Sequence, residues 1–329
     1  MNTFIKRRVA TTTRRIAPAF GLFFLSPLVA EFLLGNIAID AIWTGLFFAP
    51  LYGGGAVLIR EVTRRTGRGW PTMLMLALAY AVIEEGLVTQ SLFNPSYFGF
   101  DLLGPTHIPL LGIGAWWTIY VLTLHTVWSI AVPIALVEGF VLNRNTTPWL
   151  GKPGLAVIGA LFLLGAIVNY SLTNDQEGFV ASTQQRLGTI VVVLALIVAA
   201  FAIGRRPPPD VDRLAPNPWV VGVVSLLASS FFTLGLYLPS WATVGVWLVS
   251  FAGIAVLVTR WSRRVGWGAS HELALAGGAL LTYAWQGFPH TPIIGTTGAV
   301  DLIGNTVFAV GAVIVLAIAG LNQHRRKEP

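Results

Sequence analysis

The chain contains no cysteine, so it can form neither disulfides nor thiolate-ligated zinc or iron–sulfur centres. Any bound metal would have to be held by His, Asp or Glu. Charged residues are also scarce, at 11% of the 329 residues, whereas hydrophobic residues make up 55%. A soluble core could not bury this much apolar surface, so a lipid bilayer must be the solvent of the protein.

Acidic residues are outnumbered by basic ones. The 14 Asp and Glu against 21 Lys and Arg give a formal net charge of +7. The basic residues do not form a polar domain, because they lie in short clusters between apolar runs. We therefore interpret them as signals of membrane topology, and we expect no nucleic-acid partner.

The apolar runs have the length of membrane spans, which is set by a hydrocarbon core about 30 Å thick. They predict an all-α, polytopic transmembrane helical bundle with about ten spans, the ninth being the shortest. The predicted spans are residues 17–35, 42–59, 71–91, 113–141, 154–173, 188–204, 219–238, 241–259, 269–285 and 302–321.

The distribution of Lys and Arg predicts the orientation of these spans. If they alternate from a cytoplasmic N-terminus, nearly all basic residues fall in cytoplasmic segments and only Arg186 lies outside. This distribution satisfies the positive-inside rule, so we expect both termini to be cytoplasmic (N-in/C-in). The predicted location is the cell (cytoplasmic) membrane.

The connections between spans are short, which indicates a single transmembrane domain over residues 17–321. Residues 1–16 are expected to form a retained basic cytoplasmic N-terminus, and residues 322–329 a basic cytoplasmic C-terminus. A Pro-rich run at residues 204–219 cannot be helical, and it marks the point at which the domain could divide into two parts.

Glu84 and Glu85 are acidic residues within an apolar span. A charge at the centre of a bilayer costs roughly 2.5 to 3.5 kcal/mol, so such residues usually face a cavity or a partner. Tyr80 lies one turn before Glu84 and Thr89 one turn after Glu85. Because adjacent helical residues are about 100° apart, we expect the two acids to face different surroundings. Two crowded carboxyls should keep at least one proton near neutral pH, which suits proton transfer.

His125 lies within the fourth span, on the same helical stripe as Thr118 and Ser129. Pro133 has no N–H to donate to the carbonyl of Ser129, so a backbone acceptor is freed on that stripe. The pattern predicts a polar cavity. The alternative for His125 and for the glutamates is structural, namely hydrogen bonds that tie neighbouring helices together.

The third and fourth spans are consecutive and antiparallel, so we expect them to pack against each other. At about 1.5 Å per residue, the levels of Glu84 and His125 in the membrane would differ by about 8 Å. Glu31 and Glu138 lie near the ends of spans, and we expect both to be interfacial.

Other polar residues give weaker signals. His271 and Glu272 begin the ninth span, where they are expected to cap the helix. Four residues of metal-binding types lie in two predicted outer loops without the close spacing of a metal site, and these are Asp101, His107, His290 and Asp301. We expect no metal and no cofactor.

A Glu-Glu pair on one span followed by a histidine on the next resembles the CPBP family of glutamate intramembrane proteases, which includes CAAX-processing enzymes. The family pattern is EExxxR, then FxxxH, then HxxxN. In those enzymes the glutamate and the histidines activate a water that attacks a peptide carbonyl. By position, the resemblance implies Glu84, Glu85 and His125 as site residues.

The chain departs from this pattern in three places. Val88 stands where the family has arginine, and Val121 stands where it has phenylalanine. No HxxxN follows; the nearest candidate asparagine, Asn169, has Gly165 four residues before it. The resemblance is confined to the third and fourth spans.

Three function classes fit these features. A proton- or cation-coupled small-solute transporter accounts for the many spans and the buried acids. An intramembrane protease of the CPBP type, or a non-catalytic relative, accounts for the partial motif. A scaffold membrane protein is the third. The partners would be the lipid bilayer and a small solute or membrane peptide.

Overall fold

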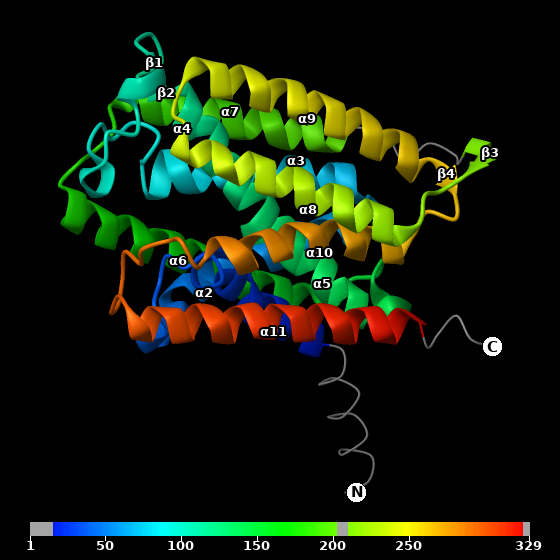
Figure 1. Cartoon of the computed structure of the whole chain (residues 1–329). Helices are drawn as coiled ribbons and strands as arrows, with labels where there is room; N and C mark the ends of the chain where they lie inside the picture. The colour runs from blue at the N-terminus through cyan, green and yellow to red at the C-terminus, as the bar shows by residue number, and fades with distance from the viewer. Residues whose placement is uncertain (1–15, 203–209, 325–329) are drawn as a thin grey trace, which may run out of the picture.

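The computed structural model describes residues 16–202 and 210–324. Within them the chain is an all-α membrane helical bundle, whose helices lie side by side (Figure 1). Most of the predicted N-terminal segment, the start of the Pro-rich run and the last five residues lie outside the described residues. The predicted fold class is confirmed.

Each of the ten predicted spans overlaps a helix of the structure, and eight of these helices are long and apolar enough to cross a membrane. The two shorter ones are Ile16–Phe32 and α10 (Ala269–Gln286). The other helices are η2 with α2 (Ile39–Thr44, Gly45–Arg65), α3 with η3 (Trp70–Ile83, Glu84–Val88), α4 with η6 and α5 (Ala115–Leu124, His125–Ala131, Val132–Phe140), α6 (Lys152–Glu177), α7 (Thr183–Ala202), α8 (Pro218–Leu234), α9 (Trp241–Ser262) and α11 (Ala299–His324).

Local sequence sets several helix ends. The side chains of Asn217 and Ser240 cap α8 and α9 by accepting hydrogen bonds from backbone N–H groups of the first turn. A left-handed residue, Gly178, ends α6. His271 caps α10 as expected, because its Nδ1 accepts the N–H of Gly268 at 3.2 Å.

The helices form a buried centre and a lipid-facing periphery. In α2, in α3 with η3 and in α4–η6–α5, between 56% and 67% of the most apolar window is buried. In α6, α7, α8, α9 and α11 this share is only 11% to 22%. The outward faces of the peripheral helices carry exposed Val, Leu and Ile side chains, which suits contact with lipid chains.

Glycines allow α2 to approach its neighbouring helices closely. A Cβ on Gly53 of α2 would lie 1.9 Å from the carbonyl oxygen of Phe23. A Cβ on Gly165 of α6 would lie 2.5 Å from the backbone N of Leu51. Small residues at helix contacts are typical of membrane bundles, where close packing replaces the hydrophobic effect.

An aromatic core joins the segments before and after residues 204–219. The rings of Trp128 in η6 and Tyr283 in α10 stack with centroids 4.4 Å apart. Tyr120 of α4 stacks on Phe232 of α8 at 5.6 Å. The indole of Trp128 also donates to the carbonyl of Ala279, so its polar atom is satisfied.

A buried ion-pair network lies where α2 and α5 meet. Glu138 accepts from Arg60 Nε at 3.0 Å and from Arg64 Nη2 at 2.6 Å. Arg60 also pairs with Glu61 at 2.8 Å and lies 3.5 Å over the ring of Trp149. Only 4% of Glu138 is exposed, so the expectation that it is interfacial is wrong. Its two arginine partners compensate the cost of burying it.

Two short strand pairs, which the sequence did not predict, mark opposite ends of the bundle (Figure 1). At one end β1 (His107–Ile108) and β2 (Ile113–Gly114) pair antiparallel. At the other end β3 (Asp210–Leu214) and β4 (Arg264–Val265) pair in parallel. We refer to these as the β1–β2 end and the β3–β4 end.

Candidate functional site

Three π-helical turns meet near the centre of the bundle. They are η1 (Leu28–Phe32), η3 (Glu84–Val88) and η6 (His125–Ala131). In η3 the N–H of Thr89 bonds to the carbonyl of Glu84 at 2.8 Å, five residues back. Each turn carries an ionisable residue: Glu31, the glutamate pair and His125. Such turns are rare and occur often at functional sites.

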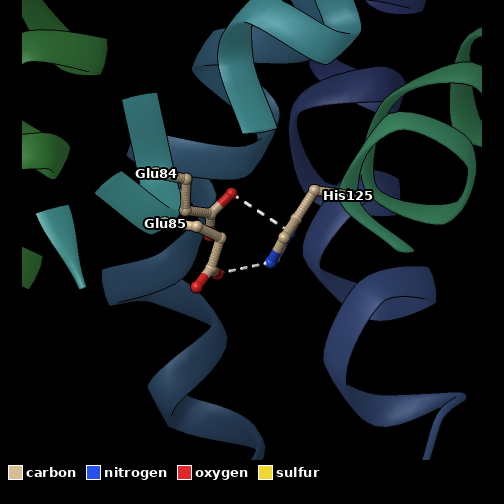
Figure 2. Close-up of side chains that lie close together, drawn as sticks. All are labelled: Glu84, Glu85 and His125. Carbon is tan, nitrogen blue, oxygen red and sulfur yellow. Dashed lines mark hydrogen bonds and ion pairs between the residues drawn. The ribbon is translucent and has the colours of Figure 1, made fainter. Parts of the chain in front are cut away.

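The structure brings Glu84, Glu85 and His125 together, as Figure 2 shows. The imidazole contacts both carboxylates. Its Nε2 is 2.7 Å from Oε1 of Glu85, and its Nδ1 is 3.1 Å from Oε2 of Glu84. The exposed fractions are 1% for Glu84 and 4% for each of the other two. We call these three residues the Glu–His–Glu cluster.

Two expectations about this cluster are wrong. Glu84 and Glu85 were expected to face different surroundings, but both contact His125. Both glutamates lie in the π turn η3, and Figure 2 shows their carboxylates on the same side of the imidazole. The expected difference in level is also absent, since direct contact places Glu84 and His125 at one depth.

Ser129 holds the imidazole as the predicted stripe implies. Its hydroxyl lies 3.0 Å from Nδ1 of His125. The carbonyl of Ser129, which Pro133 cannot satisfy, accepts a hydrogen bond of 2.5 Å from the hydroxyl of Ser26. Thr118 is different: it makes no hydrogen bond to the cluster among the described residues, and its buried hydroxyl has no partner.

The Glu85 side of the cluster is held by hydroxyl groups. Oε2 of Glu85 accepts from Thr89 at 3.0 Å, which the sequence predicted, and also from Ser91. Ser91 in turn accepts from the indole N–H of Trp117 at 3.0 Å. Ser91 was not predicted, because Ser91 lies in the irregular segment after the π turn, where helical spacing no longer applies.

The Glu84 side is lined by tyrosines. The ring of Tyr52 lies 5.8 Å from that of His125, and its hydroxyl donates to Oε1 of Glu31 at 2.5 Å. Tyr52 and Tyr80 are both close enough to interact electrostatically with the Glu84 carboxylate. The Tyr80 hydroxyl makes no hydrogen bond of normal geometry. Tyr52 was not predicted because, unlike Tyr80, it has no ionisable residue within one helical turn in the sequence.

Glu31 extends this side of the site. It was expected to be interfacial, and in the structure it is half-buried. Besides the Tyr52 hydroxyl, it accepts from the side-chain amide of Asn36 at 3.0 Å. Hydrogen bonds therefore link Asn36, Glu31 and the Tyr52 hydroxyl, and the ring of Tyr52 lies beside the imidazole of the cluster.

The geometry of the cluster suits a proton. The imidazole Nε2 is hydrogen-bonded to Oε1 of Glu85, whereas Nδ1 is hydrogen-bonded to Ser129. Oε2 of Glu84 is buried without a hydrogen-bond partner among the described residues, so it is an open acceptor beside the ring. With all three groups ionised the cluster would carry one net negative charge in a low-dielectric interior. One ligand atom from each of the three residues lies within 4.8 Å of the others, so the cluster also has the composition of a metal site.

The four loop residues of metal-binding types do not come together. Among the described residues, only the Glu–His–Glu cluster groups at least three such side chains closely. Asp101 accepts the N–H of Gly104, and Asp301 accepts from Asn305. Burial lowers the pKa of His290, and the charge of Asp301 offsets part of this effect.

Comparison with protein families gives one finding. The model of an uncharacterized membrane protein family matches residues 21–320, which includes nearly every described helix and the whole candidate site. The comparisons with curated proteins and with solved structures gave no match.

Proposed function

Since the chain belongs to an uncharacterized membrane protein family, we propose its function from its buried site. The protein is a multi-pass protein of the cell membrane that moves a small solute coupled to protons or another cation. The Glu–His–Glu cluster is the coupling site, and the observation that carries this proposal is the imidazole in contact with two buried carboxylates.

A coupling site must bind and release charge without unfolding the protein. In the cluster, a proton can pass between the imidazole and Glu85 along their 2.7 Å hydrogen bond with little movement of the side chains, and the Glu84 carboxylate lies 3.1 Å from the ring as a second acceptor. Three ionisable groups at this depth are costly, at roughly 2.5 to 3.5 kcal/mol per charge, which favours a functional role over a purely structural one.

The contacts of Tyr52 with Glu31 and the imidazole support a path for the proton. Glu31 is half-buried whereas Glu84, Glu85 and His125 are almost fully buried. Glu31 and Tyr52 therefore lie between the cluster and the more accessible side of helix Ile16–Phe32. In our proposal the β3–β4 end faces the cytoplasm, as the positions of the basic residues require.

The test is solute-driven proton flux in proteoliposomes that contain the full-length protein and a pH-sensitive dye. Candidate solutes are supplied in pools, and flux is compared for the wild type, Glu84→Gln and Glu85→Gln. Gln keeps the size and some hydrogen bonds but cannot titrate, so both variants should fold and lose at least tenfold in coupled flux, a change of about 1.4 kcal/mol. Asp175→Asn, at an exposed acid, is the matched control and should behave as the wild type.

Leucine variants separate coupling from structure. If the acids only tie helices together, Gln variants keep activity, whereas Glu84→Leu and Glu85→Leu leave partners unsatisfied at roughly 1 to 3 kcal/mol each. Thermal unfolding in detergent measures this loss. Gln variants with unchanged flux and unchanged stability would show that these glutamates do not couple transport.

A second candidate function rests on the hydrogen bond between Glu85 and His125. These residues stand at the second glutamate and the first histidine of the partial protease motif. A carboxylate and an imidazole could together activate a water for peptide hydrolysis. Incubation of the purified protein with membrane peptides tests this. Cleavage that disappears in Glu84→Gln or His125→Ala would favour hydrolysis over transport, and its absence would leave a non-catalytic relative.

A further inference from the structure

A hollow lined by four arginines lies at the β3–β4 end. Its volume is about 320 Å³, and its lining residues are Arg213, Arg260, Arg263 and Arg264. Arg260 lies in the last turn of α9, and Arg264 follows on β4. The parallel pairing of β3 with β4 brings Arg213 to the same place from a different part of the chain. The grouping therefore results from folding and not only from sequence proximity.

These arginines differ from the others near the ends of the central helices. Arg60, Arg64 and Arg65 are neutralised by Glu61 and Glu138. None of the four arginines of the hollow forms an ion pair with a carboxylate that the structure describes. The positive-inside rule accounts for basic residues at this end, but it does not require them to gather around one hollow whose described lining holds no acidic side chain. Their mutual repulsion would be relieved by a bound anion.

The hollow lies at the level where helices leave the membrane. Helix α9 ends at Ser262 and α8 begins at Pro218, on either side of the paired strands. Trp219, at the start of α8, is 83% exposed, which is typical of an indole at the headgroup level. Phosphate groups of lipids are found at this depth.

We propose that this hollow binds a phosphate-bearing anion. A guanidinium presents paired N–H donors that match two phosphate oxygens, and arginine is preferred where an anion is recognised in this way. Basic pockets between helices at the cytoplasmic face recognise anionic headgroups by the same chemistry. The two sources of such an anion are the headgroup of an anionic phospholipid and soluble phosphate. The site is remote from the Glu–His–Glu cluster in the sequence, and it does not depend on the proposed transport function.

The test compares three additives to the full-length protein in neutral detergent: phosphatidylglycerol, phosphatidylcholine and inorganic phosphate. The readouts are the midpoint of thermal unfolding and the lipid retained in native mass spectrometry. We expect phosphatidylglycerol or phosphate, but not phosphatidylcholine, to raise the midpoint of the wild type. The variant Arg260→Gln, Arg263→Gln, Arg264→Gln should bind roughly fivefold more weakly for each arginine removed.

The corresponding triple lysine variant is the matched control, because it keeps the net charge but loses the paired donors. Intermediate binding by this variant supports the arginine site, and it provides the comparison even if the glutamine variant does not fold. A response to phosphatidylglycerol alone identifies the lipid source, and a response to phosphate identifies the soluble one. The proposal is overturned if the wild type responds to neither, if the glutamine variant responds as the wild type does, or if lysine replaces arginine without loss.

Discussion

Glu138 accepts hydrogen bonds from two arginines, and one of them, Arg60, has no exposed surface at all. Replacing Glu138 by Leu removes the carboxylate partner of Arg64 and leaves Glu61 as the remaining carboxylate partner of Arg60. Breaking a buried pair in this way costs about 3 to 5 kcal/mol, so the free energy of unfolding should fall by that amount. Denaturant titration in detergent measures it.

Glu138→Gln should lose less, because its amide oxygen still accepts hydrogen bonds. The exposed Asp175→Asn is the control for removal of an acid elsewhere. A Glu138→Leu variant as stable as the wild type would mean that the remaining acceptors of Arg60, namely Glu61 and the carbonyls of Arg144 and Asn145, suffice.

For single residues, the sequence predicts which ionisable side chains belong to the site better than it predicts their hydrogen-bond partners. Glu84, Glu85 and His125 stand out because charge is rare in apolar spans. Ser91 and Tyr52 do not stand out, since hydroxyls are common in membrane helices. The burial of Glu138 could not be predicted either, because it depends on two arginines of α2 that are distant in sequence.

The length of the hydrophobic runs predicts the helices well, but it does not predict the irregular turns within them. The fourth predicted span is continuous in the structure, but its middle, His125–Ala131, is π-helical. A π turn has no distinct composition, and an analysis that assumes 3.6 residues per turn misplaces every residue after it. Pro133 was the one local indication of an irregularity, because it leaves the carbonyl of Ser129 free, and the Ser26 hydroxyl donates to that carbonyl.

Close contact between elements gives a prediction for Gly53. Gly53→Ala would place a Cβ 1.9 Å from the backbone of Phe23, so helix Ile16–Phe32 and α2 would have to separate. Overpacking of this kind costs about 1 to 3 kcal/mol, and the midpoint of thermal unfolding should fall accordingly. Gly159→Ala on α6 is the matched control: no atom lies within 4 Å of its Cβ position, so it should be neutral or stabilising. Equal effects of the two substitutions would contradict the close approach.

We propose that the basic residues orient the whole molecule in the membrane, and the absence of cysteine makes this orientation easy to test. Thr66 and Gln184 are exposed at opposite ends of the bundle, next to α2 and on α7. With single cysteines introduced, a membrane-impermeant maleimide should label position 184 in intact cells, and position 66 only after permeabilisation. Labelling at position 66 in intact cells would reverse the proposed orientation.

The sequence could not predict which helices are central. The mean hydropathy of the most apolar part of the buried span α3 with η3 is lower than that of the peripheral α6, at 1.5 against 2.1. This order is the reverse of that in soluble proteins, because lipid-facing surfaces must be apolar whereas buried helices can carry polar groups with partners. Polarity within a span is therefore a better sign of a central position than hydrophobicity.

A π turn holds one residue more than an α-helical turn, so each of the three turns around the site is equivalent to a single-residue insertion in an otherwise regular helix. Removing one residue, such as Leu87 from Glu84–Val88, would let the backbone run on as an ordinary α-helix. Because the wide turn absorbs the extra residue, the helix on either side would keep its direction and only the turn itself would be lost. Glu84 and Glu85 lie in that turn, so their directions relative to Thr89 and Ser91 would change, and the mutant would keep its span while losing its site.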